Sequence, residues 1–167
     1  MLRLLLLAAL LLVVPFSKAQ SWPQKPVRVI VPFAPGGASD LMPRLVGEKV
    51  AAIWAQPVVI DNRPGAAGNI GMEAGAKSPP DGYTLLAAPN GNLVVNPHMY
   101  SKLAYDVFKD LAPVTRIAAV QNVLVVNPEV PASSMKEFIA LARAKPGTLN
   151  FGSPGNGSQA HVGIELL

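Results

Sequence analysis

The sequence feature that most constrains the fold is a strand-like run that ends in a glycine loop and passes directly into a helix-like run. Val27–Val31 is rich in β-branched residues, Pro35–Gly37 interrupts it, and Leu41–Ala55 has the apolar spacing of an amphipathic helix. In this arrangement the free backbone N–H groups and the positive end of the helix dipole converge on one point. Such a point favours an anion, most simply a carboxylate or a phosphate.

The same alternation continues along the first half of the chain. Two further strand-like runs, Pro57–Asp61 and Tyr83–Ala88, flank a short helix-like run at Gly71–Lys77. A loop at Pro89–Asn92 then leads into a short helix that ends near Val95. Strands that alternate with helices predict an α/β fold with a parallel sheet, and ligands of such sheets bind beyond the carboxyl ends of the strands.

The composition changes after residue 113. Val114–Val126 is apolar and rich in residues that favour strands, and Leu149–Phe151 begins another strand-like run. Between them, Ser134–Ala144 has a helical apolar stripe, which Ser133 or Ser134 would cap. The helix-like pattern from residue 159 to residue 167 has no C-cap glycine and no following strand. Because so few elements cannot enclose a core, we expect the front half of a longer protein.

The N-terminus predicts export. Arg3 precedes an unbroken apolar run of eleven residues, Leu4–Val14, and small residues at Ser17 and Ala19 suit cleavage after Ala19. The alternative is an N-terminal membrane anchor, but this run falls well short of the ~20 apolar residues that span a bilayer. We therefore expect a cleaved signal peptide and a periplasmic mature chain.

The composition excludes several classes of protein. The chain has no cysteine, so disulfides, thiolate metal sites and a lipid anchor on a terminal cysteine are excluded. Without Arg3 and Lys18 the chain has twelve basic and ten acidic residues and no basic run, which argues against nucleic acid. His98 and His161 have no partners at metal-ligand spacing, so we interpret both as structural and expect no metal and no cofactor.

The first loop allows two helix starts. If Asp40 is the N-cap, Pro43 occupies the third helical position, where its missing N–H costs no helical hydrogen bond. If Ser39 is the N-cap, Pro43 removes one helical hydrogen bond. We therefore predict that Asp40 caps the helix and that Ser39 faces the cleft. The pair Gly36–Gly37 is equally compatible with a ligand loop and with a simple turn that needs a positive φ.

Other motifs are weaker. Gly155–Ala160 matches the pattern G-x-G-x-x-A, but the acidic residue of a dinucleotide site is missing, so a nucleotide is disfavoured. Asn62–Gly68 lacks the Gly-Lys-Ser/Thr of a phosphate loop, and no G-x-S-x-G elbow supplies a nucleophile, so we expect no catalytic residue. Arg63 pairs either with a substrate carboxylate or, as we favour, with a neighbouring carboxylate of the protein.

Five blocks between Trp22 and Leu167 together resemble Bug-type proteins, the extracytoplasmic solute receptors of tripartite tricarboxylate transporters. The resemblance implies a two-domain periplasmic binding protein of type II, a clamshell with doubly wound sheets that closes on a small carboxylate. The chain is truncated in comparison, because family members are roughly twice as long. The blocks are Trp22–Asp40, Gln56–Gly71, Pro79–Leu86, Tyr105–Val114 and Pro146–Ser158.

The resemblance also implies which residues bind the ligand. In the family, main-chain groups and bridging waters from loops of both lobes hold the ligand carboxyl. Carried over, the first-lobe residues are Phe33, Ala34, Gly36, Gly37, Ser39 and Asp40, with Asn90, Gly91 and Asn92 in a third loop. The second-lobe residues are Ser153, Gly155, Asn156, Gly157, Ser158 and His161. The two asparagines and Pro43 depart from the family pattern.

Three functions stay open from the sequence. The first is a receptor that captures a small organic carboxylate for the membrane subunits of a tripartite tricarboxylate-type transporter, without catalysis. The second is a sensor that passes the ligand signal to a membrane kinase, and the third, disfavoured, is an enzyme of α/β fold. We expect a signal peptide at 1–19, a first lobe at 20–116, the start of a second lobe at 117–167, and a monomer when complete.

Overall fold

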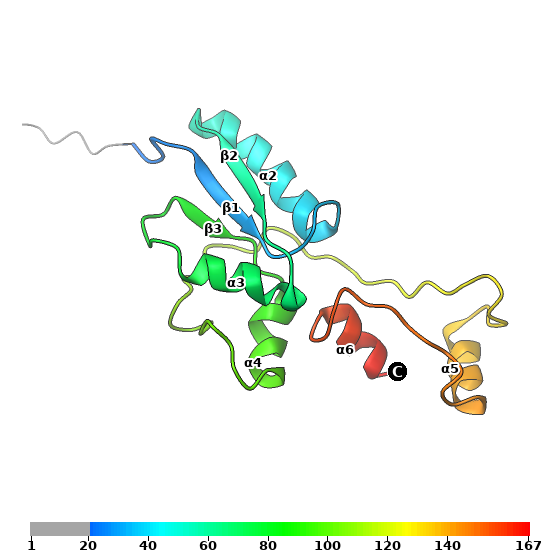
Figure 1. Cartoon of the computed structure of the whole chain (residues 1–167). Helices are drawn as coiled ribbons and strands as arrows, with labels where there is room; N and C mark the ends of the chain where they lie inside the picture. The colour runs from blue at the N-terminus through cyan, green and yellow to red at the C-terminus, as the bar shows by residue number, and fades with distance from the viewer. Residues whose placement is uncertain (1–20) are drawn as a thin grey trace, which may run out of the picture.

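The computed structural model describes residues 21–167; the predicted signal peptide and its cleavage site after Ala19 lie outside these residues. Three strands, β1 (Val27–Val31), β2 (Val58–Asn62) and β3 (Thr84–Leu86), form a parallel sheet in the order β2-β1-β3 (Figure 1). The predicted parallel sheet is therefore confirmed for this part of the chain. The bounds of β1 are those predicted, and the bounds of β2 and β3 differ from the predictions by one or two residues.

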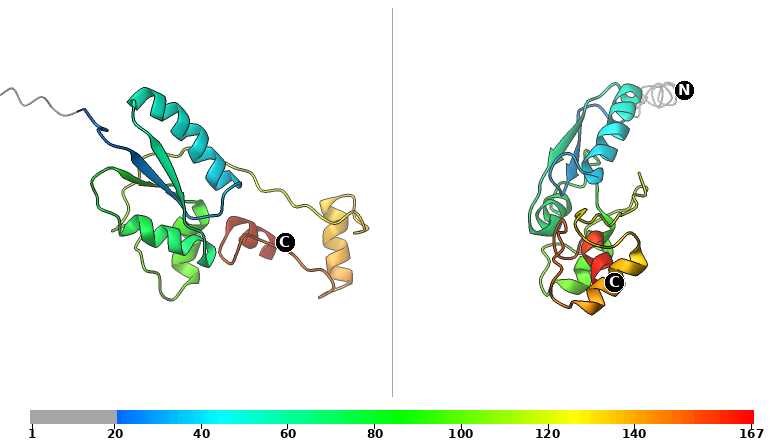
Figure 2. Two further views of the ribbon diagram at one scale, coloured as in Figure 1. Left: turned by 45° about the horizontal axis from the view of Figure 1, so that its top comes forward. Right: turned by 90° about the vertical axis from the view of Figure 1, so that its right-hand side faces the viewer.

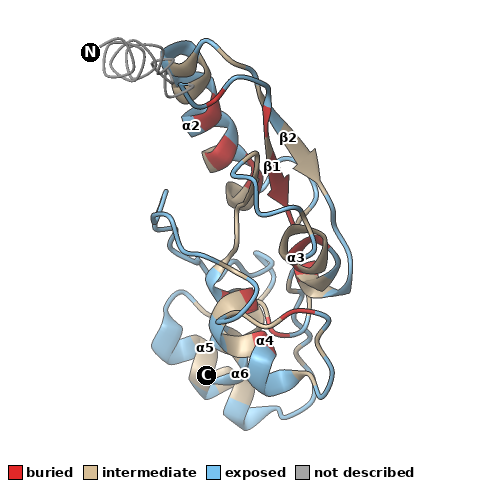
Figure 3. Ribbon diagram, turned by 90° about the vertical axis from the view of Figure 1, so that its left-hand side faces the viewer, coloured by how far each residue is buried: buried red, intermediate tan, exposed pale blue. Residues whose placement is uncertain are grey.

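Helices connect the strands and cover both faces of the sheet. Helix α2 (Ala38–Trp54) follows β1 and packs mainly on β2, whereas α3 (Asn69–Ala76) follows β2 and packs on β1 and β3 (Figure 2). A short 3₁₀ turn, η1 (Ala66–Gly68), precedes α3. Strand β1 is central, and its buried side chains form the core together with Met72 of α3 (Figure 3). This is the doubly wound arrangement that the family resemblance implies, built on the parallel sheet that the alternation predicts.

Close approach of α3 to the sheet depends on one glycine. A Cβ atom at Gly71 would lie 2.5 Å from Pro32 Cα and 2.8 Å from the carbonyl oxygen of Arg63. Both neighbours are backbone atoms that cannot rotate away. The absence of a side chain at residue 71 therefore sets the distance between α3 and the end of β1.

After β3 the chain forms a π turn, η2 (Gly91–Val95), which continues into a short helix, α4 (Asn96–Met99). Tyr105 in the following connector is buried.

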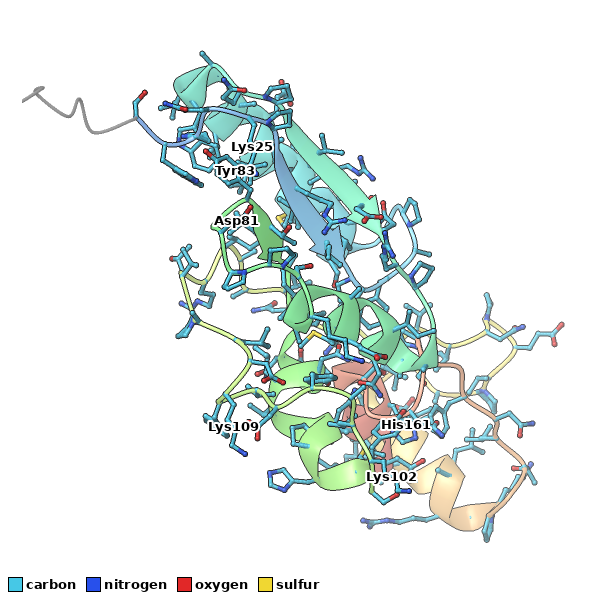
Figure 4. All side chains as sticks on the ribbon, turned by 60° about the vertical axis from the view of Figure 1, so that its left-hand side comes forward. Lys25, Asp81, Tyr83, Lys102, Lys109 and His161 are labelled. Atoms are coloured by element: carbon cyan, nitrogen blue, oxygen red, sulfur yellow. The ribbon has the colours of Figure 1, made fainter. Side chains whose placement is uncertain are left out.

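At the opposite end of the sheet, Lys25 pairs with Asp81 at 3.2 Å and lies 4.3 Å from the ring centroid of Tyr83. Figure 4 shows this cluster far from His161, which belongs to the end of the molecule that carries the candidate site.

The second part of the chain contains α5 (Met135–Ala144) and α6 (Gln159–Glu165). Ser134 caps α5, because its Oγ accepts a hydrogen bond from the Glu137 N–H at 3.3 Å. The strand that begins at Leu149 and the β-rich run at Val114–Val126 do not form strands in the structure. Those two predictions are wrong because a strand needs a hydrogen-bonded neighbour, and neither segment has one among residues 21–167.

Candidate functional site

Three loops meet at the carboxyl ends of the strands. They follow β1, β2 and β3 and comprise residues 32–37, 63–68 and 87–90. Gly68 marks their junction, because a Cβ at this residue would lie 2.9 Å from Asn92 Nδ2 and 3.1 Å from Phe33 Cε2. The structure therefore brings the first and third predicted ligand loops to one place.

Asp40 organises the first loop from inside. It is 2% exposed, its Oδ2 accepts a hydrogen bond from the Gly36 N–H at 2.9 Å, and its Oδ1 accepts from Arg44 Nε and Asn62 Nδ2, each at 2.9 Å. These donors, Arg44 first, hold the pKa of the Asp40 carboxyl well below its usual range. The side chain of Asn62 also donates to the carbonyl of Phe33 at 3.0 Å, so it ties β2 to the same loop.

The prediction that Asp40 is the N-cap is wrong. Gly37, with extended backbone (ψ 170°), is the N-cap, and Asp40 is the third helical residue. From that position a carboxylate can reach back to an N–H ahead of the helix, as the acidic residue of a capping box does. Pro43 consequently lies inside α2, where it cannot donate to the carbonyl of Ser39.

The start of α2 offers unpaired donors. The Gly37 carbonyl accepts hydrogen bonds from the Asp40 and Leu41 N–H groups, both at 2.9 Å. These are the first hydrogen bonds of the helix. The N–H groups of Gly37, Ala38 and Ser39 precede them and have no helical acceptor. With the dipole of a 17-residue helix behind them, these groups suit a carboxylate.

Asn92 belongs to a buried cluster behind the loops rather than to an open surface. Asn69 Oδ1 accepts hydrogen bonds from Asn96 Nδ2 at 2.7 Å, Tyr105 Oη at 3.1 Å and Asn92 Nδ2 at 3.4 Å. Asn92 Nδ2 also donates to the carbonyl of Ala67 at 2.9 Å. Burial raises the pKa of the Tyr105 phenol, so it stays a donor. We call Asn69, Asn92, Asn96 and Tyr105 the amide cluster.

The loop at residues 153–158, which the sequence predicts for a second lobe and which we call the second-lobe loop, lies against residues 67–100. Tyr100 Oη donates a hydrogen bond to the carbonyl of Asn156 at 3.1 Å. A Cβ at Gly91 would lie 2.7 Å from the Gly157 carbonyl oxygen, and a Cβ at Gly155 would lie 3.2 Å from Ala67 Cβ. Gly157 of the second-lobe loop is therefore in direct contact with Gly91 of the third loop, and Gly155 is in direct contact with Ala67.

Side chains of the second-lobe loop mainly stabilise the loop itself. Ser153 Oγ accepts from the Gly155 N–H at 3.3 Å, and Ser158 Oγ caps α6 by accepting from the His161 N–H at 3.2 Å. His161 Nδ1 lies 3.5 Å from the Gly157 nitrogen, and its Nε2 lies 3.8 Å from Glu165 Oε1. The glycines at 155 and 157 have φ values of 135° and 86°, which residues with a side chain rarely adopt.

The sequence analysis missed several residues of this region. Asn62, Asn69 and Asn96 hold the loops together, and the only sequence signal for Asn62 is its place directly after the predicted strand Pro57–Asp61. Ala66 and Ala67 have φ values of 47° and 53°, a conformation that no pattern of alanines predicts.

Other predicted groups have structural partners or lie elsewhere. Arg63 Nε pairs with Asp61 Oδ2 at 3.0 Å, which confirms the pairing with a neighbouring carboxylate.

Hollows of about 210 and 490 Å³ are lined by none of the predicted ligand residues. Among residues 21–167 there is no group of three or more His, Cys, Asp or Glu placed to hold a metal, and no helix long and apolar enough to cross a membrane.

Comparison with known sequences gives a consistent result. Residues 42–167 match the model of the tripartite tricarboxylate transporter family receptor. A UPF0065 protein of Bordetella pertussis is 38% identical over 167 residues, which is 100% of this chain and 51% of that protein. Protein BugT of the same organism is 41% identical over 150 residues, 89% of this chain and 46% of BugT. The chain thus spans about half the length of these relatives.

Comparison with solved structures agrees. A periplasmic transporter structure has a TM-score of 0.82 and 41% identity, covering 87% of this chain and 49% of that one. Rpa4515 of R. palustris with adipate has a TM-score of 0.84 and 38% identity, with the same coverage. MatC of Rhodopseudomonas palustris with bound malate has a TM-score of 0.62 and 29% identity, covering 74% of this chain and 42% of MatC. The fold is that of a periplasmic binding protein.

Proposed function

The chain belongs to the tripartite tricarboxylate transporter receptor family, and we propose that it serves as a periplasmic receptor that captures a small organic carboxylate. Members of this family are solute-binding receptors and not enzymes. The observation that carries the proposal is the start of α2, where a glycine loop held rigid by Asp40 leaves three N–H groups ahead of a long helix.

The carboxylate of the ligand sits ahead of α2. The N–H groups of Gly37, Ala38 and Ser39 donate to it from the first lobe, and the Ser153–Ser158 loop encloses it from the second. Asp40 positions these donors without touching the ligand, because its carboxylate is buried and already accepts three hydrogen bonds. The remaining residues of the proposed site are Phe33, Ala34, Gly36, Asn90, Gly91 and His161, whereas Asn92 lies behind the site in the amide cluster.

The ligand class that we propose is a dicarboxylate of about four to six carbons. Two similar proteins are solved with adipate and with bound malate, which are acids of this kind. A second carboxylate needs a second set of donors, and we assign this set to the Ser153–Ser158 loop on the other side of the ligand. We place the lobes at residues 20–116 and 117–167, and cleavage of the signal peptide after Ala19.

The proposed partners are the membrane subunits of a tripartite tricarboxylate-type transporter. The family description names such a transporter, and nothing among residues 21–167 favours a sensor kinase. The receptor carries the acid through the periplasm, and the enclosed carboxylate defines the state that the transporter recognises.

A thermal-shift series tests the proposal. The protein expressed from its own gene is heated with succinate, malate, adipate and, as controls, glucose and the neutral diamide of adipic acid. At a hundredfold excess over Kd, a bound acid stabilises the protein by ~2.7 kcal/mol, so its Tm rises. A Tm that rises with glucose or with the diamide as much as with any acid contradicts a carboxylate receptor.

A further inference from the structure

The amide cluster contains one polar atom without a partner. Asn96 is 1% exposed, and its Oδ1 is the one buried side-chain oxygen or nitrogen among residues 21–167 that makes no hydrogen bond. The orientation of the amide is fixed, because Nδ2 donates to Asn69 Oδ1 at 2.7 Å and Oδ1 must point the other way. A buried acceptor without a donor is costly, so its retention calls for an explanation.

The unpartnered oxygen faces the second-lobe loop. A Cβ at Gly157 would lie 2.2 Å from Asn96 Oδ1, so this glycine lies directly against the unpartnered oxygen. The Gly157 N–H has only a long contact, 3.5 Å to His161 Nδ1. A donor that is weakly used on one lobe therefore lies next to an acceptor that is unused on the other.

We propose that Asn96 is a positioning residue that holds the second-lobe loop on the first lobe by accepting a hydrogen bond from the Gly157 N–H when the lobes close. The inference rests on the proposed function, because the loop that it holds is the one that encloses the carboxylate. Closure brings the Gly157 nitrogen from His161 to Asn96, which satisfies the buried oxygen. The closed state thus gains a hydrogen bond that the open state lacks.

Three glycines allow a matched test. Gly157→Ala adds a methyl group that meets Asn96 Oδ1, at a φ of 86°. Gly147→Ala is its control, because Gly147 has a similar φ of 74° but no atom within 4 Å of the added methyl group. Gly91→Ala adds a methyl group that would lie 2.7 Å from the Gly157 carbonyl oxygen. Gly91 lies in the π turn η2 and has no positive φ, so this substitution carries no backbone strain of that kind.

The first readout is amide hydrogen exchange of residues 153–159 at a saturating concentration of the acid that gives the largest thermal shift, where the lobes are closed. The second readout is the Kd of that acid. In Asn96→Ala we expect exchange to rise about fivefold, the effect of losing one hydrogen bond. Gly91→Ala and Gly157→Ala should weaken binding about 10- to 100-fold through overpacking, and Gly147→Ala should not. In the Asn96→Ala background, Gly157→Ala should cost clearly less than in the wild type.

The outcomes separate this inference from the proposed function. Unchanged exchange in Asn96→Ala, or equal losses from Gly157→Ala in both backgrounds, would overturn the role of Asn96 even if the wild type binds an acid. If Asn96 had only a structural role, Asn96→Ala would lower the unfolding midpoint of the first lobe. Exchange of residues 153–159 would then rise no more than exchange in the rest of the chain. If the wild type binds no acid, the proposed function fails, and the role of Asn96 in the closed state fails with it.

Discussion

Asn69 is the residue whose loss should most disturb the loops around the candidate site. In Asn69→Ala three donors lose their shared acceptor, but two of them keep another: Asn92 Nδ2 still donates to the Ala67 carbonyl, and Tyr105 Oη still donates to the Asn92 carbonyl at 3.0 Å. Asn96 Nδ2 is left buried with no acceptor, which costs ~1–3 kcal/mol. We therefore expect Asn69→Ala to lower the free energy of unfolding by about 2 kcal/mol.

The assay is urea unfolding followed by the fluorescence of Trp22 and Trp54, which contact each other with ring centroids 4.7 Å apart. The midpoint should fall with an unchanged m-value. Asn69→Asp is the matched control, because the structure uses only Oδ1 of Asn69, and a carboxylate offers the same oxygen to the three donors. If Asn69→Asp is as unstable as Asn69→Ala, the acceptor role assigned to this oxygen is refuted.

Three further predictions concern other parts of the chain. Gly71→Ala should destabilise the first lobe by ~1–3 kcal/mol in the same assay, because the new methyl group meets the backbone of Pro32; a neutral result would contradict the packing described. The pKa of Asp40 is lowered, so its stabilisation is complete above its unfolded pKa of ~3.9 and is lost as the pH falls below it. Asp40→Asn should therefore flatten the decline in urea midpoint between pH 5 and pH 3, and an unchanged slope would contradict the assignment. Ser134→Ala should cost ~1 kcal/mol, seen as faster amide exchange confined to α5; unchanged exchange would contradict the cap.

The parts of the fold that sequence predicts are those that local pattern determines. The β-branched run at Val27–Val31 and the apolar spacing of α2 and α5 are visible in short windows of sequence. Glycine loops at the ends of strands are visible too, and the α/β order brings them to one edge. The sheet and the meeting of the Asn90–Asn92 loop with the first loop therefore follow from the sequence.

The errors arise where a local choice depends on distant partners. Asp40 does not cap α2 because Arg44 and Asn62 surround its carboxylate one turn inside the helix, and Asn62 comes from another strand. The run at Leu149–Phe151 has the composition of a strand but no neighbour to pair with among residues 21–167. The amide cluster joins residues from 69 to 105, so no short window of sequence contains it.

The central claim is that the site ahead of α2 binds a carboxylate as an anion. The most direct test is calorimetric titration of the protein expressed from its own gene with adipate and, in parallel, with the neutral diamide of the same length. The account predicts that the acid binds and that the diamide binds at least about tenfold more weakly, since charge-assisted hydrogen bonds are roughly twice as strong as neutral ones. Equal affinities for the two compounds, or binding of the diamide alone, would contradict it.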